Sequence, residues 1–284
     1  MRDTRMNAGT VRGAQMRAIA RHEFRAGIRG RMVPAFAILF AALTIGVTLA
    51  GLGASGQILV QGFTRTAVSL LTLSVYLLPL VGLILGASAF GGEDGGTELL
   101  LAQPISRSTA LYARVAGLSL CVAGIALAGF GTAGLVVLSA TGTVGIGGYA
   151  VLSSATTVLA IASLHVGVFI GVLVRRRTTA VGWALATWFA AAVLYDLASI
   201  TVLQITGSGH PGPLLVGMLA LNPLDGVRVL GTLELGADVL LGPTGAAVQR
   251  LLGGAGWLIM WGSLILWTLL PLGAARFVYA RRDF

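Results

Sequence analysis

Lysine is absent from this 284-residue chain, so all 19 of its positively charged residues are arginine. A Walker-type phosphate loop needs a lysine, so the chain is not a conventional ATPase by itself. A pyridoxal Schiff base needs a lysine as well. The one cysteine, Cys121, excludes an intrachain disulfide and a multi-cysteine metal site.

Charge of either sign is scarce. Only 10% of the residues are charged, against roughly 25% in an average soluble domain. Hydrophobic residues make up 56% of the chain, the mean hydropathy is +0.90, and there are 41 glycines. This composition excludes a water-soluble globular enzyme. It is typical of an all-α polytopic membrane protein, in which small residues let helices approach closely.

Six apolar stretches are long enough to cross a bilayer, which takes about 20 residues. They lie near Met32–Leu52, Val68–Phe90, Val115–Leu138, Tyr149–Val174, Val181–Thr206 and Ala255–Ala275.

The arginines predict the orientation of these spans. Sixteen of them fall on the side of the N-terminus and three on the other side. Because basic residues favour the cytoplasmic side, both termini are expected in the cytoplasm, with the chain in the inner membrane. The net charge of +9 then reflects topology, and no nucleic-acid partner is expected.

The first 31 residues are predicted to be a cytoplasmic arm that ends in an amphipathic helix, Thr10–Arg31. An apolar stripe and a basic stripe run side by side at helical spacing, namely Met16, Ala20, Phe24 and Ile28 next to Arg17, Arg21, Arg25 and Arg29. This pattern favours an interfacial helix on membrane lipid; a plain polybasic flank is the alternative.

Residues 207–254 form a long outer segment with four of the eight prolines. Its apolar run Leu214–Leu221 is too short to span. A re-entrant hairpin or an interfacial helix is expected, and the segment is a candidate docking surface or lid. A passive connector is the alternative.

Polar groups inside the membrane are functional candidates because they are expensive to bury there. Asp196, next to Tyr195, lies toward the outer end of the fifth span. It is open to several roles: capping a helix, pairing with Arg228, binding a neighbouring subunit, or acting on a substrate or proton. His165, in the fourth span, is expected to be a hydrogen-bonded interior residue.

The second and fourth spans each contain a small-residue motif, and none of the spans contains a row of methionines. Gly82/Gly86 and Gly167/Gly171 are GxxxG pairs, which allow close helix packing within a subunit or at a dimer seam. The six methionines are scattered, so no metal-binding ladder and no metal site are predicted.

The inner loop, residues 91–110, predicts a short amphipathic helix. Thr97 can cap it, Glu98 lies in its first turn, and the apolar Leu99–Leu101 follows. Pro104 ends it and Ser106 can cap the next helix. Such a helix suits docking into a groove on a soluble partner.

This loop resembles the coupling-helix motif of ABC-2 type permeases. The matching residues are Glu93, Gly96, Thr97, Leu99–Leu101, Pro104, Ile105, Ser106 and Arg107. The segment 20–25 resembles the elbow helix of the same family. The resemblance implies a homodimeric six-helix domain over residues 32–284, with a cytoplasmic ABC ATPase dimer that holds ATP and Mg and no cofactor on this chain. The expected coupling residues are Glu93, Asp94, Gly96, Thr97, Glu98, Leu100, Pro104, Ser106 and Arg107.

A narrower resemblance covers residues 193–197 and 221–228. Both are similar to segments of the permeases that serve the maturation of copper-containing nitrous-oxide reductase. That resemblance implies a periplasmic β-helical, copper-handling partner, contacted through Asn222, Pro223, Asp225 and Arg228. The permease would be a non-catalytic subunit that transmits ATP-driven motion. The alternatives are an ABC-2 exporter of a lipid-like or drug-like solute and, from another class, an ATP-independent secondary transporter.

Overall fold

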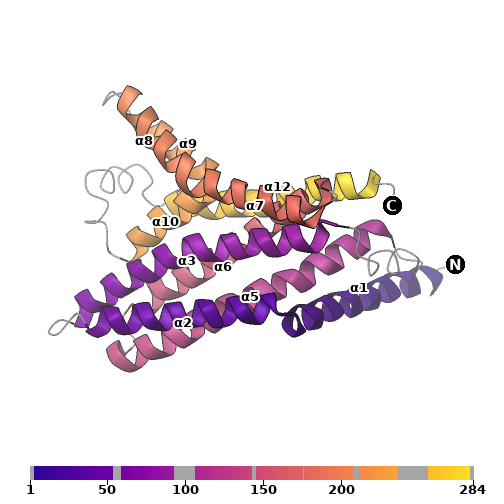
Figure 1. Cartoon of the computed structure of the whole chain (residues 1–284), viewed down its shortest axis with the longest axis horizontal. Coiled ribbons are helices and arrows are strands. Elements are labelled where there is room, and N and C mark those ends of the chain that lie inside the picture. The colour runs from indigo at the N-terminus through magenta and orange to yellow at the C-terminus, as the bar shows by residue number, and fades with distance from the viewer. Residues whose placement is uncertain are drawn as a thin grey trace.

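The computed structural model describes residues 3–53, 59–92, 106–142, 145–174, 176–206, 211–235 and 255–281, and no strand occurs in these ranges. The expected all-helical fold is confirmed (Figure 1). The helices are α1 (Asp3–Arg29), α2 (Met32–Gly53), α3 (Leu59–Phe90), α5 (Arg107–Thr141), α6 (Ile146–Leu173), α7 (Arg177–Phe189), the π-helix η1 (Ala190–Leu194), α8 (Tyr195–Thr206), α9 (Pro211–Leu221), α10 (Pro223–Glu234) and α12 (Ala255–Arg281).

Six helices of the described chain are long and apolar enough to span a membrane, as predicted. They are Met32–Gly51, Thr66–Phe90, Arg107–Ser139, Ile146–Leu173, Arg177–Val202 and Gly256–Arg281. The fifth span is continuous through α7, η1 and α8. The N- and C-terminal ends of the chain lie at the same end of the bundle (Figure 1).

Glycines join α3 to α6 at the centre of the bundle. A Cβ on Gly82 or Gly86 would collide with backbone atoms of α6, and one on Gly167 or Gly171 would collide with backbone atoms of α3. We call these four residues the glycine seam. The GxxxG pairs therefore pack within one subunit, which was one of the two uses expected of them.

Helix α1 packs along the beginning of α5 through a narrow face. Gly117 of α5 lies against the backbone of Ala20, and Gly27 of α1 lies against the sulfur of Cys121. Two members of the predicted apolar stripe, Met16 and Ile28, are 38% and 48% exposed. The helix thus packs on the bundle with part of the stripe and leaves the rest uncovered.

The fifth span leaves the bundle at the end opposite the termini, where α8 and α9 splay away side by side (Figure 1). Helix α9 returns toward the bundle, and the chain breaks at Asn222 before α10. Helices α9 and α10 lie within the outer segment 207–254; residues 207–210 and 236–254 lie outside the described residues.

Candidate functional site

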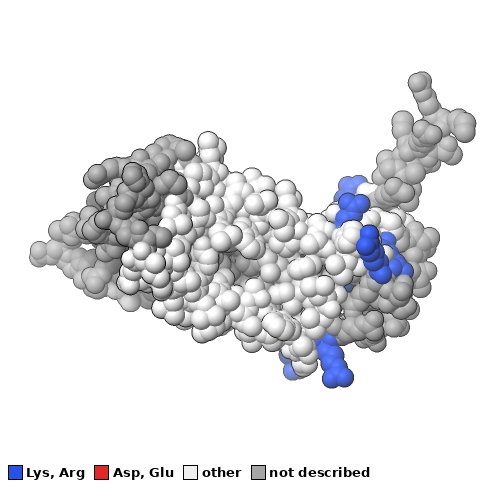
Figure 2. Space-filling view, turned by 90° about the horizontal axis from the view of Figure 1, so that it is seen from above, with Lys and Arg blue, Asp and Glu red and all other residues white. Residues whose placement is uncertain are grey.

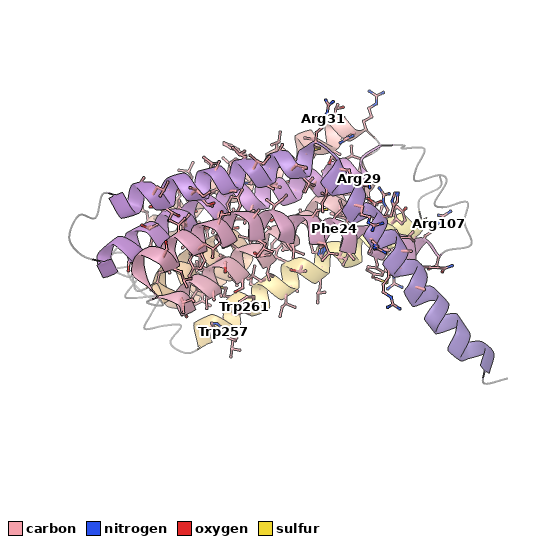
Figure 3. All side chains as sticks on the ribbon, turned by 90° about the horizontal axis from the view of Figure 1, so that it is seen from below. Phe24, Arg29, Arg31, Arg107, Trp257 and Trp261 are labelled. Atoms are coloured by element: carbon pink, nitrogen blue, oxygen red, sulfur yellow. The ribbon has the colours of Figure 1, made fainter. Side chains whose placement is uncertain are left out.

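Apart from Arg228 of α10, the arginines with described side chains gather at one end of the bundle, and no acidic side chain shows on the face drawn in Figure 2. Arg29, Arg31 and Arg107 lie at this end, whereas Trp257 and Trp261 lie toward the opposite one (Figure 3). Tryptophan is enriched where a helix meets the membrane surface, so the two residues fit the far interface. We call the arginine-rich end the inner end and the other the outer end.

The inner end is held together by Arg114 of α5. Its Nε lies 2.7 Å from Oε1 of Glu23 in α1, and its Nη2 donates to the carbonyl of Ala89 in α3 at 3.0 Å. Its guanidinium also lies 4.6 Å from the ring centroid of Phe90. This inner junction ties three helices together at the place where α3 leads into the 91–110 loop.

Most of the expected coupling residues lie outside the described residues, because these end at Gly92 and resume at Ser106. The two that are described sit at the start of α5. Ser106 caps the helix, as predicted, by accepting from the backbone N–H of Thr109 at 3.2 Å. Arg107 is exposed and donates to the carbonyl of Ala280 near the end of α12 at 3.4 Å.

A second arginine, Arg228 of α10, organises the outer end. Its two terminal nitrogens bind both oxygens of Asp196 in α8 at 2.8 and 3.0 Å. One of them also binds Asp225 of α10 at 2.9 Å, and the other donates to the hydroxyl of Tyr76 in α3 at 2.8 Å. This outer junction joins α3, α8 and α10. Of the roles open to Asp196, the structure shows the pairing with Arg228.

Asn222 strengthens the same connection from the helix break. Its Oδ1 caps α10 by accepting from Leu224, while its Nδ2 donates to the carbonyl of Ala191 in η1 at 2.8 Å and to Asp225 at 3.2 Å. Pro223 occupies the first turn of α10, where its missing N–H is no loss. Asn222 and Asp225 are only 4% and 8% exposed. In this chain they face inward, so they hold helices together.

The outer junction changes the pKa values of Asp225 and Arg228. Burial raises the pKa of Asp225 to about 7; the charge of Arg228 opposes this shift and the neighbouring Asp196 adds to it. Burial alone would lower the pKa of Arg228, but the hydrogen bonds that it donates to Asp196 and the charges of both carboxylates raise it instead. The junction therefore holds one firm ion pair and a second acid that is easily protonated.

The remaining intramembrane polar residues are bonded to neighbouring backbone. The Tyr195 hydroxyl donates to the carbonyl of Met218 in α9 at 2.8 Å, which links the two splayed helices. His165 is 5% exposed and its Nδ1 lies 2.8 Å from the carbonyl of Thr268 in α12. The expected interior hydrogen bond of His165 is confirmed. Within the described ranges, no group of three His, Cys, Asp or Glu side chains could hold a metal ion.

Sequence reasoning missed three parts of these junctions. Tyr76 was not singled out, because one tyrosine among apolar residues is an ordinary core residue. The pairing of Glu23 with Arg114 joins residues 91 positions apart, and no local pattern connects them. The π-helix before Tyr195 has no sequence signature, although such bulges are frequent at functional sites.

Comparison with known proteins places this arrangement in a family. The profile of the ABC-2 family transporter proteins matches residues 17–284. The chain belongs to this family. It is therefore a permease subunit of an ABC transporter and a multi-pass protein of the inner membrane; membership implies an ATPase partner and a dimeric permease.

Two relatives narrow the comparison. The probable ABC transporter permease protein NosY of Pseudomonas aeruginosa is 31% identical over 271 residues, which cover 93% of this chain and 97% of that protein. The protein with the same description from Stutzerimonas stutzeri is 32% identical over 284 residues, with the same coverage. The chain is thus NosY-like along almost its whole length.

Proposed function

We propose that this permease transmits ATP-driven motion from a cytoplasmic ABC ATPase dimer to a periplasmic β-helical protein that handles copper for nitrous-oxide reductase. The single observation that carries the proposal is the helix α3. It ends at Phe90, beside the inner junction and the 91–110 loop, and it carries Tyr76 at the outer junction. One continuous helix, which contains Pro79, therefore reaches both junctions.

The proposal places the inner end in the cytoplasm, because the arginines gather there. The 91–110 loop then faces the ATPase, which holds ATP and Mg, with Arg107 and Ser106 at the edge of the docking region. The present chain supplies no catalytic group and no cofactor site to this scheme; it supplies the coupling.

At the outer end the proposal assigns motion to α8 and α9. Asn222, Asp225 and Arg228 face the bundle, so their task is to fix the position of α10 and of the splayed helices. The splayed helices then present the surface that the periplasmic partner contacts. In this proposal the four residues expected to contact the partner support the helices that contact it instead. They are Asn222, Pro223, Asp225 and Arg228.

The dimer is proposed to use the fifth span. Only 6% of this span is buried in the single chain, against 61% of the fourth span. Trp183, Phe189 and Leu197 are among its large exposed side chains, at 59%, 48% and 59%. A second copy of the chain would cover this face within the membrane.

The test is a gentle-detergent pull-down from native membranes, followed by a copper assay. We expect an ABC ATPase and a periplasmic β-helical protein to co-purify with the permease. We expect Arg228→Met to leave the complex assembled and to reduce the copper content of the mature reductase. Normal copper loading in the assembled variant complex would contradict the proposal.

The competing function is the export of a lipid-like or drug-like solute. An apolar cavity beside η1 is the observation that favours it. An exporter would confer efflux or resistance on cells that lack any nitrous-oxide reductase, whereas the transmission function would not. Co-purification of an ATPase without a periplasmic protein would point the same way.

A further inference from the structure

A cavity of about 370 Å³ is lined by residues of α3, α6, α7, η1 and α12, together with the starts of α8 and α10 and the end of α9. This volume is within the usual range of ligand pockets, about 300–1,000 Å³. Four of the six membrane spans contribute to its walls, and the start of α10 closes it. Its lining includes Ala162 and Val166 of α6, Ala191 of η1, Leu224 of α10 and Trp267 of α12. No charged side chain is part of the lining.

Five polar side chains of the lining are already engaged by the protein. Ser163 and Thr187 donate to carbonyls of their own helices, and Trp188 donates to the carbonyl of Tyr76. Tyr195 and Asn222 donate to Met218 and Ala191. Each of these groups already donates a hydrogen bond to a backbone carbonyl. A ligand with hydrogen-bonding groups would gain little here, whereas a hydrocarbon needs no such partners.

The size of the cavity favours a slender ligand. Ala162, Ser163 and Leu224 are 2%, 7% and 7% exposed, so they line its interior. Leu221, at 63% exposure, lies at its edge. An α-helix with side chains is about 10–12 Å wide, so a helix of another protein does not enter such a space. An unbranched flexible chain is narrow enough to enter. The lining atoms then gain the dispersion contacts that a packed interior provides.

We propose that this cavity binds one acyl chain of a membrane phospholipid as a resident ligand. The bilayer surrounds the four spans with such chains, and an acyl chain leaves one apolar environment for another. Asn222 and Ala191 line the cavity, and the hydrogen bond between them also joins η1 to α10. A bound acyl chain would therefore lie next to the connection between the fifth span and α10. The inference does not depend on the periplasmic partner.

The test uses the permease–ATPase complex, reconstituted in vesicles of phosphatidylethanolamine and phosphatidylglycerol. A trace of the phosphatidylglycerol carries a diazirine at the middle of one acyl chain. After photolysis, the adducts are mapped by mass spectrometry. We expect adducts on the interior residues Ala162 and Leu224 as well as on Leu127 of α5, which is 73% exposed. Adducts on Leu127 without any on the interior residues would overturn the proposal.

Two matched variants separate the cavity from the general lipid contact. Val166→Phe places a ring in the cavity, and Ile38→Phe places the same ring on α2, where the side chain is 70% exposed and outside the lining. We expect Val166→Phe to lose the adducts on Ala162 and Leu224 and to keep those on Leu127. Ile38→Phe should keep both. Equal interior labelling in the two variants, at equal unfolding temperatures, would overturn the proposal.

Two further outcomes would assign the cavity differently, and either would overturn the proposal. Interior adducts that disappear during ATP turnover would show a transported solute instead of a resident chain. Interior adducts on the dissociated monomer, with none on the dimer, would show that a second copy closes the cavity. A resident chain is expected to give the same interior labelling with and without ATP.

Discussion

The two ends of the molecule each depend on one arginine, but the two arginines are used differently. The side chain of Arg114 at the inner junction is 11% exposed, and its contacts include the carboxylate of Glu23, the carbonyl of Ala89 and the ring of Phe90. Arg228 at the outer junction has a side chain that is 32% exposed and meets two carboxylates. The contacts of Arg114 tie three helices together, so we call the inner junction rigid. One of the two acids around Arg228 has a raised pKa and can take up a proton, so we call the outer junction adjustable.

Breaking the inner junction should have the largest effect. In Arg114→Met, Glu23 keeps its charge in a mostly buried place with no partner. Loss of one member of a buried pair destabilises by about 3 kcal/mol or more. We expect a large fall in the unfolding temperature of the purified permease, measured by tryptophan fluorescence in detergent.

The double variant Arg114→Met/Glu23→Gln is the control for this effect. It removes both charges, so we expect it to recover much of the lost stability. A double variant as unstable as the single one would mean that Arg114 acts through its contacts with Ala89 and Phe90, and not through the ion pair.

Breaking the outer junction should cost less stability. Arg228→Met leaves two acids, but water reaches this site more easily and Asp225 can take up a proton. We expect a loss of about 1–2 kcal/mol, together with faster proteolysis of α8–α9 than of the bundle. A variant as unstable as Arg114→Met would remove the distinction between a rigid and an adjustable junction.

The raised pKa of Asp225 predicts that stability depends on pH. Because the pKa of Asp225 is raised from 3.8 to about 7, its contribution to stability is full below pH 3.8 and is lost as the pH rises to about 7. The charged groups around it are Arg228 on its own helix and Asp196 on α8. We expect the unfolding temperature of the native protein to fall between pH 5 and 7 and to level off above pH 7, and that of Asp225→Asn to fall less.

The matched control for the pH experiment is Glu23→Gln, which removes an acid from the inner junction. It should unfold at a lower temperature and keep the pH slope of the native protein. An unchanged slope in Asp225→Asn would show that another group titrates in this range.

The smallest effect is expected from Tyr76→Phe. It removes the hydroxyl that accepts from Arg228 and leaves both carboxylates in place. One such hydrogen bond is worth about 0.5–1.5 kcal/mol. If α3 drives the outer end, copper loading of the reductase should fall more than this small loss of stability explains. Loading that follows stability alone would limit Tyr76 to a structural role.

The parts that the sequence predicts are those with a local signal. The six spans follow from apolar runs of sufficient length, and Ser106 follows from the helix-start pattern around it. The intramembrane Asp196 was singled out because a buried acid needs a partner, and Arg228 was among the partners considered. Such inferences need only segment composition and the energetics of one residue.

The parts that the sequence does not predict depend on where helices meet. Glu23 and Arg114 pair across 91 positions, and Tyr76 and Arg228 across 152. Asn222 and Asp225 look like surface loop residues in the sequence, yet they are buried, because α10 folds back onto η1, α3 and α6. Helix packing decides all of these, and the periodicity of a single helix does not specify it.

The glycine seam has a consequence for motion. Backbones in direct contact do not slide past each other without separating, so we expect the parts of α3 and α6 that the seam joins to move together. From Phe90 to Tyr76, a path of 14 residues that includes Pro79, α3 extends over roughly 21 Å. If the permease transmits motion as proposed, a displacement of the inner end of α3 would carry the adjoining part of α6 with it.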